Sequence, residues 1–256
     1  MSKFQEIFQR TEIKYLISEE QYMALRERLQ GLAEVDQYGE TDILNIYYDT
    51  PDFQLIRASL EKPLYKEKLR LRSYGKPGTD TTSFIEIKKK YNGVVYKRRI
   101  DAPYMEAKDY LEGKRDLEQK SQIKQEIDAF RTGYRGLRPA MAISYKRVAM
   151  AGTEDPELRI TFDREIRWRT DRLDLREGNK GEDLLKPGQR LMEVKIANAF
   201  PFVLARMFSE LGIFPVSYSK YGKGYQTMAA RQPAAALAYR LTGMAAGGER
   251  GEMAYA

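Results

Sequence analysis

Charged and aliphatic residues alternate along several segments of the chain with the two-residue period of a β-strand. A Glu, an aliphatic residue and a Lys follow one another in residues 12–14, 86–88 and 193–195. Within residues 65–74, four basic side chains occupy one face of the expected strand, and two leucines occupy the other. If helices cover the apolar faces, the charges of all these strands point inward. The pattern therefore favours a closed barrel with a charged lumen.

The same alternation, interrupted by stretches of helical spacing, predicts an α+β domain with antiparallel strands. An Asn-Gly pair at residues 92–93 favours a tight hairpin. Strands are expected at residues 9–17, 43–48, 65–74, 83–90, 94–100, 139–150, 158–162, 166–170 and 190–197. Helices are expected at residues 18–29, 51–56, 103–113, 116–131 and 201–211. Because no linker separates the two charged β-rich halves, residues 1–228 are expected to form one domain, followed by an Ala/Gly-rich flexible tail at residues 229–256.

Composition narrows the chemistry that the chain can perform. With 42% hydrophobic and 32% charged residues it is typical of a soluble globular protein, and its net charge of +7 suits an anionic partner. The absence of Cys and His excludes disulfides, thiol catalysis, Cys/His zinc sites and imidazole acid–base chemistry. Catalysis would depend on carboxylates, Lys, Arg, Tyr and hard metals. No segment resembles a signal peptide or a spanning helix, so a cytoplasmic location is expected.

Each charged face has an ordinary alternative, which is the solvated face of an antiparallel sheet. Arginine, however, suits the planar recognition of phosphate, and Glu86 argues against a nucleic-acid ribbon unless a metal or a lysine neutralises it. The excess of cations over carboxylates suits several phosphates, and the carboxylates could then hold a hard divalent ion. Residues 217–224 contain glycines and lysines but lack the spacing of a P-loop.

An ordered set of short motifs over roughly residues 8–225 resembles the polyphosphate polymerase (VTC) domain family of the triphosphate tunnel metalloenzyme superfamily, also called CYTH-like. The motifs are Arg-Thr-Glu-Ile-Lys-Tyr at 10–15, Tyr-Tyr-Asp-Thr at 47–50, Lys-Leu-Arg-Leu-Arg-Ser-Tyr at 68–74, Ile-Glu-Ile-Lys-Lys-Lys at 85–90, Ser-Tyr-Lys-Arg at 144–147, Leu-Arg-Ile-Thr-Phe-Asp at 158–163, Leu-Met-Glu-Val-Lys at 191–195 and Ser-Lys-Tyr at 219–221. The resemblance implies an antiparallel eight-stranded β-barrel tunnel, with helices packed outside, that needs Mn²⁺ or Mg²⁺.

The resemblance also implies roles for individual side chains of the lumen. The expected catalytic cations are Lys14, Arg70, Arg72, Lys88, Arg147 and Arg159. The expected substrate-binding side chains are Arg10, Lys68, Lys97, Lys195, Lys220 and Tyr145. The expected metal ligands are Glu193, Glu12 and Glu86.

In the function that the resemblance implies, the γ-phosphoryl group of ATP passes to phosphate or to a growing polyphosphate chain. The hydrolytic CYTH-type branch carries Glu-x-Glu-x-Lys in its first strand, whereas this chain has Arg10 in place of the first Glu, which favours the polymerase branch. Two alternatives remain open: a triphosphatase on the same scaffold and a non-catalytic polyanion-binding module. No specific nucleic-acid partner is expected, and any membrane partner would be a separate chain.

Overall fold

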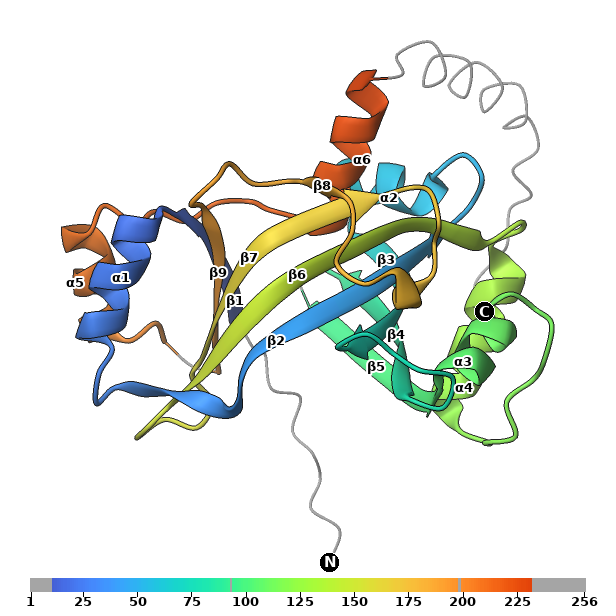
Figure 1. Ribbon diagram of the computed structural model, residues 1–256, viewed down its shortest axis with the longest axis horizontal. Coiled ribbons are helices and arrows are strands. Elements are labelled where there is room, and N and C mark those ends of the chain that lie inside the picture. The colour runs from blue at the N-terminus through green and yellow to red at the C-terminus, as the bar shows by residue number, and fades with distance from the viewer. Residues whose placement is uncertain (1–10, 93, 198, 232–256) are drawn as a thin grey trace, which may run out of the picture.

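A single curled antiparallel sheet forms the centre of the computed structural model, which describes residues 11–231 except 93 and 198 (Figure 1). Its strands are β1 (Thr11–Ile17), β2 (Ala33–Asp49), β3 (Tyr65–Tyr74), β4 (Thr82–Tyr91), β5 (Val94–Pro103), β6 (Arg138–Gly152), β7 (Arg159–Arg169), β8 (Glu182–Asp183) and β9 (Arg190–Ile196). Eight strands follow one another in the order β1-β9-β7-β6-β2-β3-β4-β5, and the short β8 pairs with β7 beside this path. The predicted antiparallel arrangement is confirmed.

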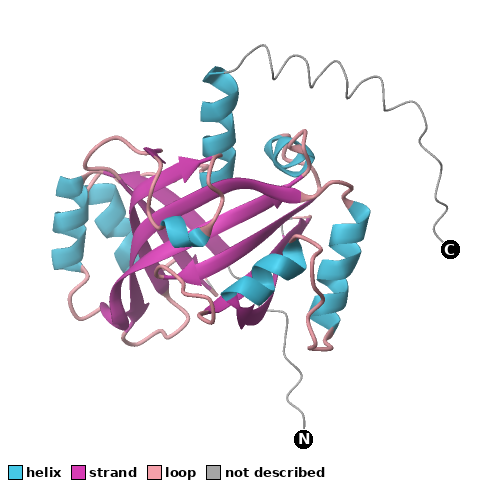
Figure 2. Ribbon diagram, turned by 45° about the vertical axis from the view of Figure 1, so that its right-hand side comes forward, coloured by secondary structure: helices cyan, strands magenta, loops and turns pink. Residues whose placement is uncertain are grey.

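Helices lie around the outside of the sheet (Figure 2). They are α1 (Glu19–Arg28), α2 (Gln54–Leu60), α3 (Tyr104–Leu111), α4 (Gln122–Gly133), α5 (Phe202–Glu210) and α6 (Lys220–Arg231), with a 3₁₀ turn, η1, at Leu175–Glu177. A capping box between Ser18 and Gln21 begins α1, where a helix is expected from residue 18. Within the described residues, no helix combines the length and the apolar character needed to cross a membrane.

Two of the three apolar cores separate helices from the outer faces of the strands, and the third packs α2 and α6 against β2 and β6. Leu69 and Leu71 of β3 are fully buried in a core with side chains of α3 and α4. In the other half of the sheet, Ile160 and Phe162 of β7 are fully buried in a core with side chains of α1 and α5. Burying each such side chain stabilises the fold by about 1.5–3 kcal/mol. The expected division is therefore confirmed: helices cover the apolar faces, and the charged faces line the concave side.

The two ends of the strand order come together without pairing directly in the described part of the chain. Residues that follow α5 cover the free edge of β1: Tyr15 forms an isolated bridge with Pro215, and the Val216 amide donates to the Lys14 carbonyl at 2.7 Å. Across the concave side, burial raises the pKa of Glu12, but Lys88 of β4 and other lysines outweigh it and lower that pKa. The sheet therefore encloses a tunnel-like lumen, as expected from the sequence, although its two end strands do not close it by pairing with each other.

Several predicted boundaries differ from the structure: β2, expected at residues 43–48, begins at Ala33, and α4, expected from residue 116, begins at Gln122. The strands expected at residues 158–162 and 166–170 form one strand, because a register irregularity opposite β6 and a positive φ of 49° at Glu165 bend the strand without ending it. Helix α6 was not expected, and its end at Arg231 takes in the first residues of the expected tail. Residues 232–256, the rest of that tail, lie outside the described residues.

Close packing explains why glycines occur inside α6. A Cβ at Gly224 would stand 2.6 Å from the Met141 sulfur, and one at Gly222 would stand 3.1 Å from a methyl carbon of Leu60. Glycine at these positions therefore lets the helix approach β6 and α2 without displacing the Met141 and Leu60 side chains. Glycine disfavours a helix on propensity alone, which explains why the sequence pattern there does not predict one.

Candidate functional site

One group of charges on the concave side surrounds Glu86 of β4. Arg70 lies opposite it on β3, and its Nε and Nη2 donate to the Glu86 Oε2 at 2.8 and 2.6 Å. Arg72 Nη1 lies 3.7 Å from the same oxygen, and Lys97 Nζ lies 3.2 Å from Oε1. Burial opposes ionisation of Glu86, but these three cations outweigh it and lower its pKa to about 2. The group remains cationic, with three positive charges around one carboxylate.

A second group lies on β1, β6, β7, β9 and the first residue of α6. Arg147 binds Asp163 with two hydrogen bonds, Nε to Oδ1 at 2.6 Å and Nη2 to Oδ2 at 2.7 Å. Lys220 Nζ lies 2.6 Å from the same Asp163 Oδ2 and 2.8 Å from Glu193 Oε1. Lys14 Nζ is 3.5 Å from the same Glu193 oxygen. Two buried carboxylates thus hold three cations in fixed positions.

The two carboxyl groups of this second group stay ionised because of their neighbours. Burial raises the pKa of Asp163 and of Glu193, but Arg147 and Lys220 around Asp163, and Lys220, Lys14 and Arg147 around Glu193, outweigh it and lower both pKa values. The same carboxylates overcome the effect of burial on Lys220 and raise its pKa. Asp163, Glu193 and Lys220 are therefore charged near neutral pH, and Glu12, whose Oε1 lies 3.3 Å from Lys14 Nζ, places a third carboxylate beside these cations.

The start of α6 connects the two groups. The Tyr221 hydroxyl donates to Asp49 Oδ2 at 2.7 Å, and its ring stacks on Tyr47 with centroids 4.5 Å apart. The Tyr47 hydroxyl in turn accepts from Arg70 at 3.0 Å. Just before α6, the Ser219 hydroxyl accepts from Lys68 Nζ at 3.2 Å. Docking of α6 therefore places Lys220 in the second group. It also places Ser219 against Lys68 of β3, the strand that carries Arg70 and Arg72 of the first group.

Tyr145 of β6 lies between the two groups. Its hydroxyl accepts from Arg72 Nη2 at 3.1 Å, and its ring faces Arg147 and Lys220 at 5.1 and 4.6 Å from the centroid. Asn45, two positions before Tyr47 on β2, accepts from Arg72 Nε at 2.9 Å. Asn45 and Tyr145 thus fix the position of Arg72, and the Tyr145 ring lies between Arg72 and the cations Arg147 and Lys220.

The remaining sequence-predicted residues lie nearer to solvent. Lys88 is exposed and acts electrostatically on Glu12, as does the half-buried Lys195. Arg159 is exposed at the start of β7, opposite Lys195, and it forms no ion pair within the described part of the chain. Arg10 lies outside the described residues. The structure thus brings together eleven of the expected side chains, including Glu12 with its Oε1 3.3 Å from Lys14 Nζ, and it leaves Arg159 at the rim.

Residues 9–229 match the family described as VTC domain. The chain belongs to the VTC domain family. Its fold is similar to that of a proposed adenylate cyclase from Bacillus halodurans, with a TM-score of 0.52, 16% identity, and coverage of 82% of this chain and 95% of the other. A proposed adenylyl cyclase from Hippeastrum, HpAC1, gives a TM-score of 0.51 at 16% identity, covering 84% of this chain and 95% of the other. No curated protein matches the chain.

Sequence reasoning assigned no role to Asp163, the most deeply buried carboxylate of the VTC domain's lumen. The alternation in residues 158–163 places Asp163 on the charged face with Arg159 and Thr161. That alternation could have identified Asp163 as a lumen residue. Asp49 was missed as well. It accepts from the backbone amides of Leu55 and Ile56 at the start of α2, and this contact could not be foreseen from the strand pattern.

Divalent metal fits one part of this lumen better than another. Glu12 and Glu193 lie on neighbouring strands, close enough for the charge of Glu193 to act on the Glu12 carboxyl. Mg²⁺ and Mn²⁺ accept one or two carboxylates together with phosphate oxygens, so these two residues could hold such an ion. Glu86 Oε2 accepts from Arg70, whereas the buried Oε1 accepts no hydrogen bond within the described residues and has Lys97 Nζ 3.2 Å away. In the described part of the chain, no three acidic side chains form a group that could hold a metal alone.

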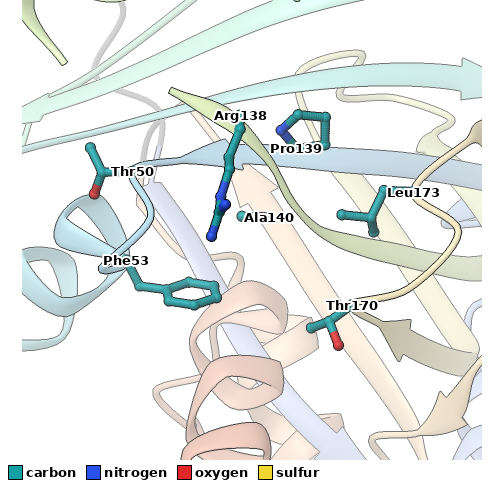
Figure 3. A pocket seen from close by; sticks show the side chains of 7 residues that line it. All are labelled: Thr50, Phe53, Arg138, Pro139, Ala140, Thr170 and Leu173. Carbon is teal, nitrogen blue, oxygen red and sulfur yellow. The ribbon is translucent and has the colours of Figure 1, made fainter. Parts of the chain in front are cut away.

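A cavity of about 350 Å³ opens beside the ends of β2, β6 and β7 (Figure 3). It is lined by Thr50, Phe53, Arg138, Pro139, Ala140, Thr170 and Leu173. None of these residues belongs to the two charged groups of the lumen. The cavity is therefore separate from the candidate site.

Proposed function

We propose that this VTC domain binds a chain of phosphates along its lumen and transfers the γ-phosphoryl group of ATP to a growing polyphosphate. The observation that carries the proposal is the arrangement of two groups of cations on different strands of the curled sheet, each held by buried carboxylates. A linear triphosphate lying between them would contact Arg70 and Lys97 in one group and Arg147 and Lys220 in the other. Fixed cations of this kind neutralise charge without rearranging when a ligand binds.

Phosphoryl transfer suits the side chains that the lumen contains. It requires in-line positioning and stabilisation of negative charge more than it requires a nucleophilic side chain. Arg70 and Arg147 present planar donors to phosphate oxygens, and Lys14 and Lys220 add point charges. A chain without Cys and His can therefore perform this reaction.

Glu193 and Glu12 would hold the divalent metal beside the phosphates. Bound there, Mn²⁺ or Mg²⁺ would neutralise charge on the phosphoryl oxygens. In the protein itself, Lys14 and Lys220 keep Glu193 ionised, which is the state that a metal ligand requires. Arg147 orients Asp163, and Asp163 in turn positions Lys220.

A triphosphatase is the second candidate function. HpAC1, which shares the fold, is described as having a dominant triphosphatase activity. The same cations would bind the substrate in both reactions, and the difference is whether water or phosphate is positioned to attack. A module that binds polyanions without catalysis is the third candidate, and it needs no metal ligand.

Incubation of the protein with ATP and Mn²⁺, followed by gel electrophoresis of the products, separates these functions. The proposal predicts ADP together with a ladder of polyphosphate. If ADP and free phosphate form without any chain, the protein is a triphosphatase. If ATP binds but is not consumed in the presence of either metal, the domain is a binding module, and both enzymatic functions are wrong.

Triphosphate binding is expected to weaken as the pH rises above 8. Burial lowers the pKa of Lys68 to about 8, although Tyr47 opposes this shift. Burial also lowers the pKa of Lys97 to about 8, although the negative charge of Glu86 opposes it. A bound anion favours the protonated lysines, so affinity is full below this pKa and falls above it by up to about tenfold per pH unit for each lysine. Calorimetric titration of triphosphate between pH 7 and 9.5 measures the effect.

The matched control for this pH dependence replaces both lysines with arginine, which keeps its charge over the whole range. The Lys68→Arg/Lys97→Arg variant should lose most of the decline above pH 8. An equal decline in both proteins would assign it to groups of the protein other than Lys68 and Lys97, because triphosphate itself only becomes more negative as the pH rises.

A further inference from the structure

Lysines face one another across neighbouring strands on the concave side of β3 and β4. Lys68 is opposite Lys88, and Lys66 is opposite Lys90 at the end of the ladder. Lys88 is in turn opposite Lys97 on β5. Like charges placed directly opposite each other on one face destabilise a sheet. The two successive lysine pairs therefore represent a cost that an anionic ligand would remove.

The outer pair differs from the charged groups deeper in the lumen because carboxylates do not accompany it. Lys66 Nζ donates to the Ser59 carbonyl at 3.2 Å, and Lys90 forms no side-chain hydrogen bond or ion pair within the described residues. Burial and the like charges of Lys90, Lys62 and Lys88 lower the pKa of Lys66. Arg70, two strand positions further in from Lys68, is by contrast neutralised by Glu86. Cationic charge is thus least compensated at the outer end of these strands.

We propose that Lys66 and Lys90, with Lys62 just before β3, extend the lumen site and bind the further phosphates of a linear polyphosphate longer than triphosphate. This inference rests on the proposed function, because it assumes that the inner phosphates occupy the lumen. Lys68 and Lys88 connect the extension to the inner site through an unbroken row of lysines on one face of β3 and β4. The extension would let the domain retain a chain that has outgrown the inner site.

Linear polyphosphate fits this lysine row better than single-stranded nucleic acid does. Proteins that bind single strands pair their cations with aromatic rings on which the bases stack. The exposed Tyr65 and Tyr91 lie on the opposite face of the same strands, because they alternate with Lys66 and Lys90. The concave face of β3 and β4 at this end thus offers charge without a stacking surface.

The test compares the binding of triphosphate and of long-chain inorganic polyphosphate to the Lys66→Gln/Lys90→Gln variant. The expected result is a roughly tenfold loss of affinity for the long chain, since two partly exposed charge-assisted contacts are removed, with little change for triphosphate. The control variant, Lys76→Gln/Lys186→Gln, removes the same charge from exposed positions, with Lys76 just beyond the other end of β3. It should bind both ligands as the unmodified protein does.

Other outcomes overturn the inference. If affinities for both ligands fall equally, or if neither changes, the outer lysines do not recognise chain length. If single-stranded RNA binds as tightly as the long chain and loses affinity in the same variant, the row binds nucleic acid. Removing one like-charge pair should not unfold the protein, and retained triphosphate binding verifies this. Failure of the proposed function is distinguishable, because it appears as absent ATP turnover in the unmodified protein.

Discussion

Replacing Glu193 with Gln is expected to lower ATP turnover at least about a hundredfold, because the lumen loses a carboxylate that could hold the metal. Glu193 is buried, and Lys220, Lys14 and Arg147 lie within 2.8, 3.5 and 3.6 Å of its oxygens. Removal of its negative charge leaves these cations free to bind phosphate. Metal-free triphosphate should therefore bind as tightly as before or more tightly while turnover falls.

Steady-state turnover and calorimetric titration of triphosphate together measure this separation of binding from catalysis. Glu27→Gln, which removes a charge from the exposed side of α1, is the control and should leave both quantities unchanged. Turnover within about twofold of the unmodified protein would mean that Glu193 is not a metal ligand. A parallel loss of binding and turnover would mean that its role is to position Lys220.

Replacing Arg147 with Ala is expected to lower the free energy of unfolding by about 3 kcal/mol, since it leaves a buried carboxylate with half of its partners. Asp163 is fully buried and would keep Lys220 but lose both hydrogen bonds from the guanidinium. Arg147 and Lys220 hold the pKa of Asp163 below its usual range despite burial. That stabilisation is present above the ordinary Asp pKa and is lost as the pH falls, so the difference should be full at neutral pH and shrink in acid.

Chemical denaturation at pH 7 and again near pH 3, below the ordinary Asp pKa, measures this effect, and the chain offers a matched control. Arg28 forms an ion pair of the same 2.6 Å length with Glu210, but both side chains are largely exposed. Arg28→Ala should cost no more than about 1 kcal/mol. Similar losses in the two variants would contradict the view that burial gives the Arg147–Asp163 pair its energetic weight.

The alternation of side chains predicted which face of each strand is charged. Leu69 and Leu71 lie outside and Arg70 lies inside because the period of a strand is a local property of the backbone. The same reasoning placed Lys14, Lys88 and Glu193 on the concave side. It also predicted helices over the outer faces, since those leucines require an apolar partner.

Contacts between distant segments could not be predicted in this way. Lys220 reaches Asp163 because Tyr221 docks on Asp49, a partner 172 positions earlier in the chain. The glycines of α6 obscured the helix that makes this possible. Strand register likewise places Glu86 opposite Arg70 on β3, whereas Glu12 and Glu193 lie on the paired strands β1 and β9. Alternation alone does not determine that register.

The pairing of β1 with β9 has a consequence for biosynthesis. Thr11 at the start of β1 is opposite Ile196 at the end of β9, so the first described strand must wait for one of the last before it has a neighbour. At ordinary rates of translation this delay is on the order of ten seconds or more, during which the edges of β1 are exposed on the nascent chain. The tunnel should therefore assemble late and all at once, and nascent chains that stop before β9 are expected to be substrates for chaperones and proteases.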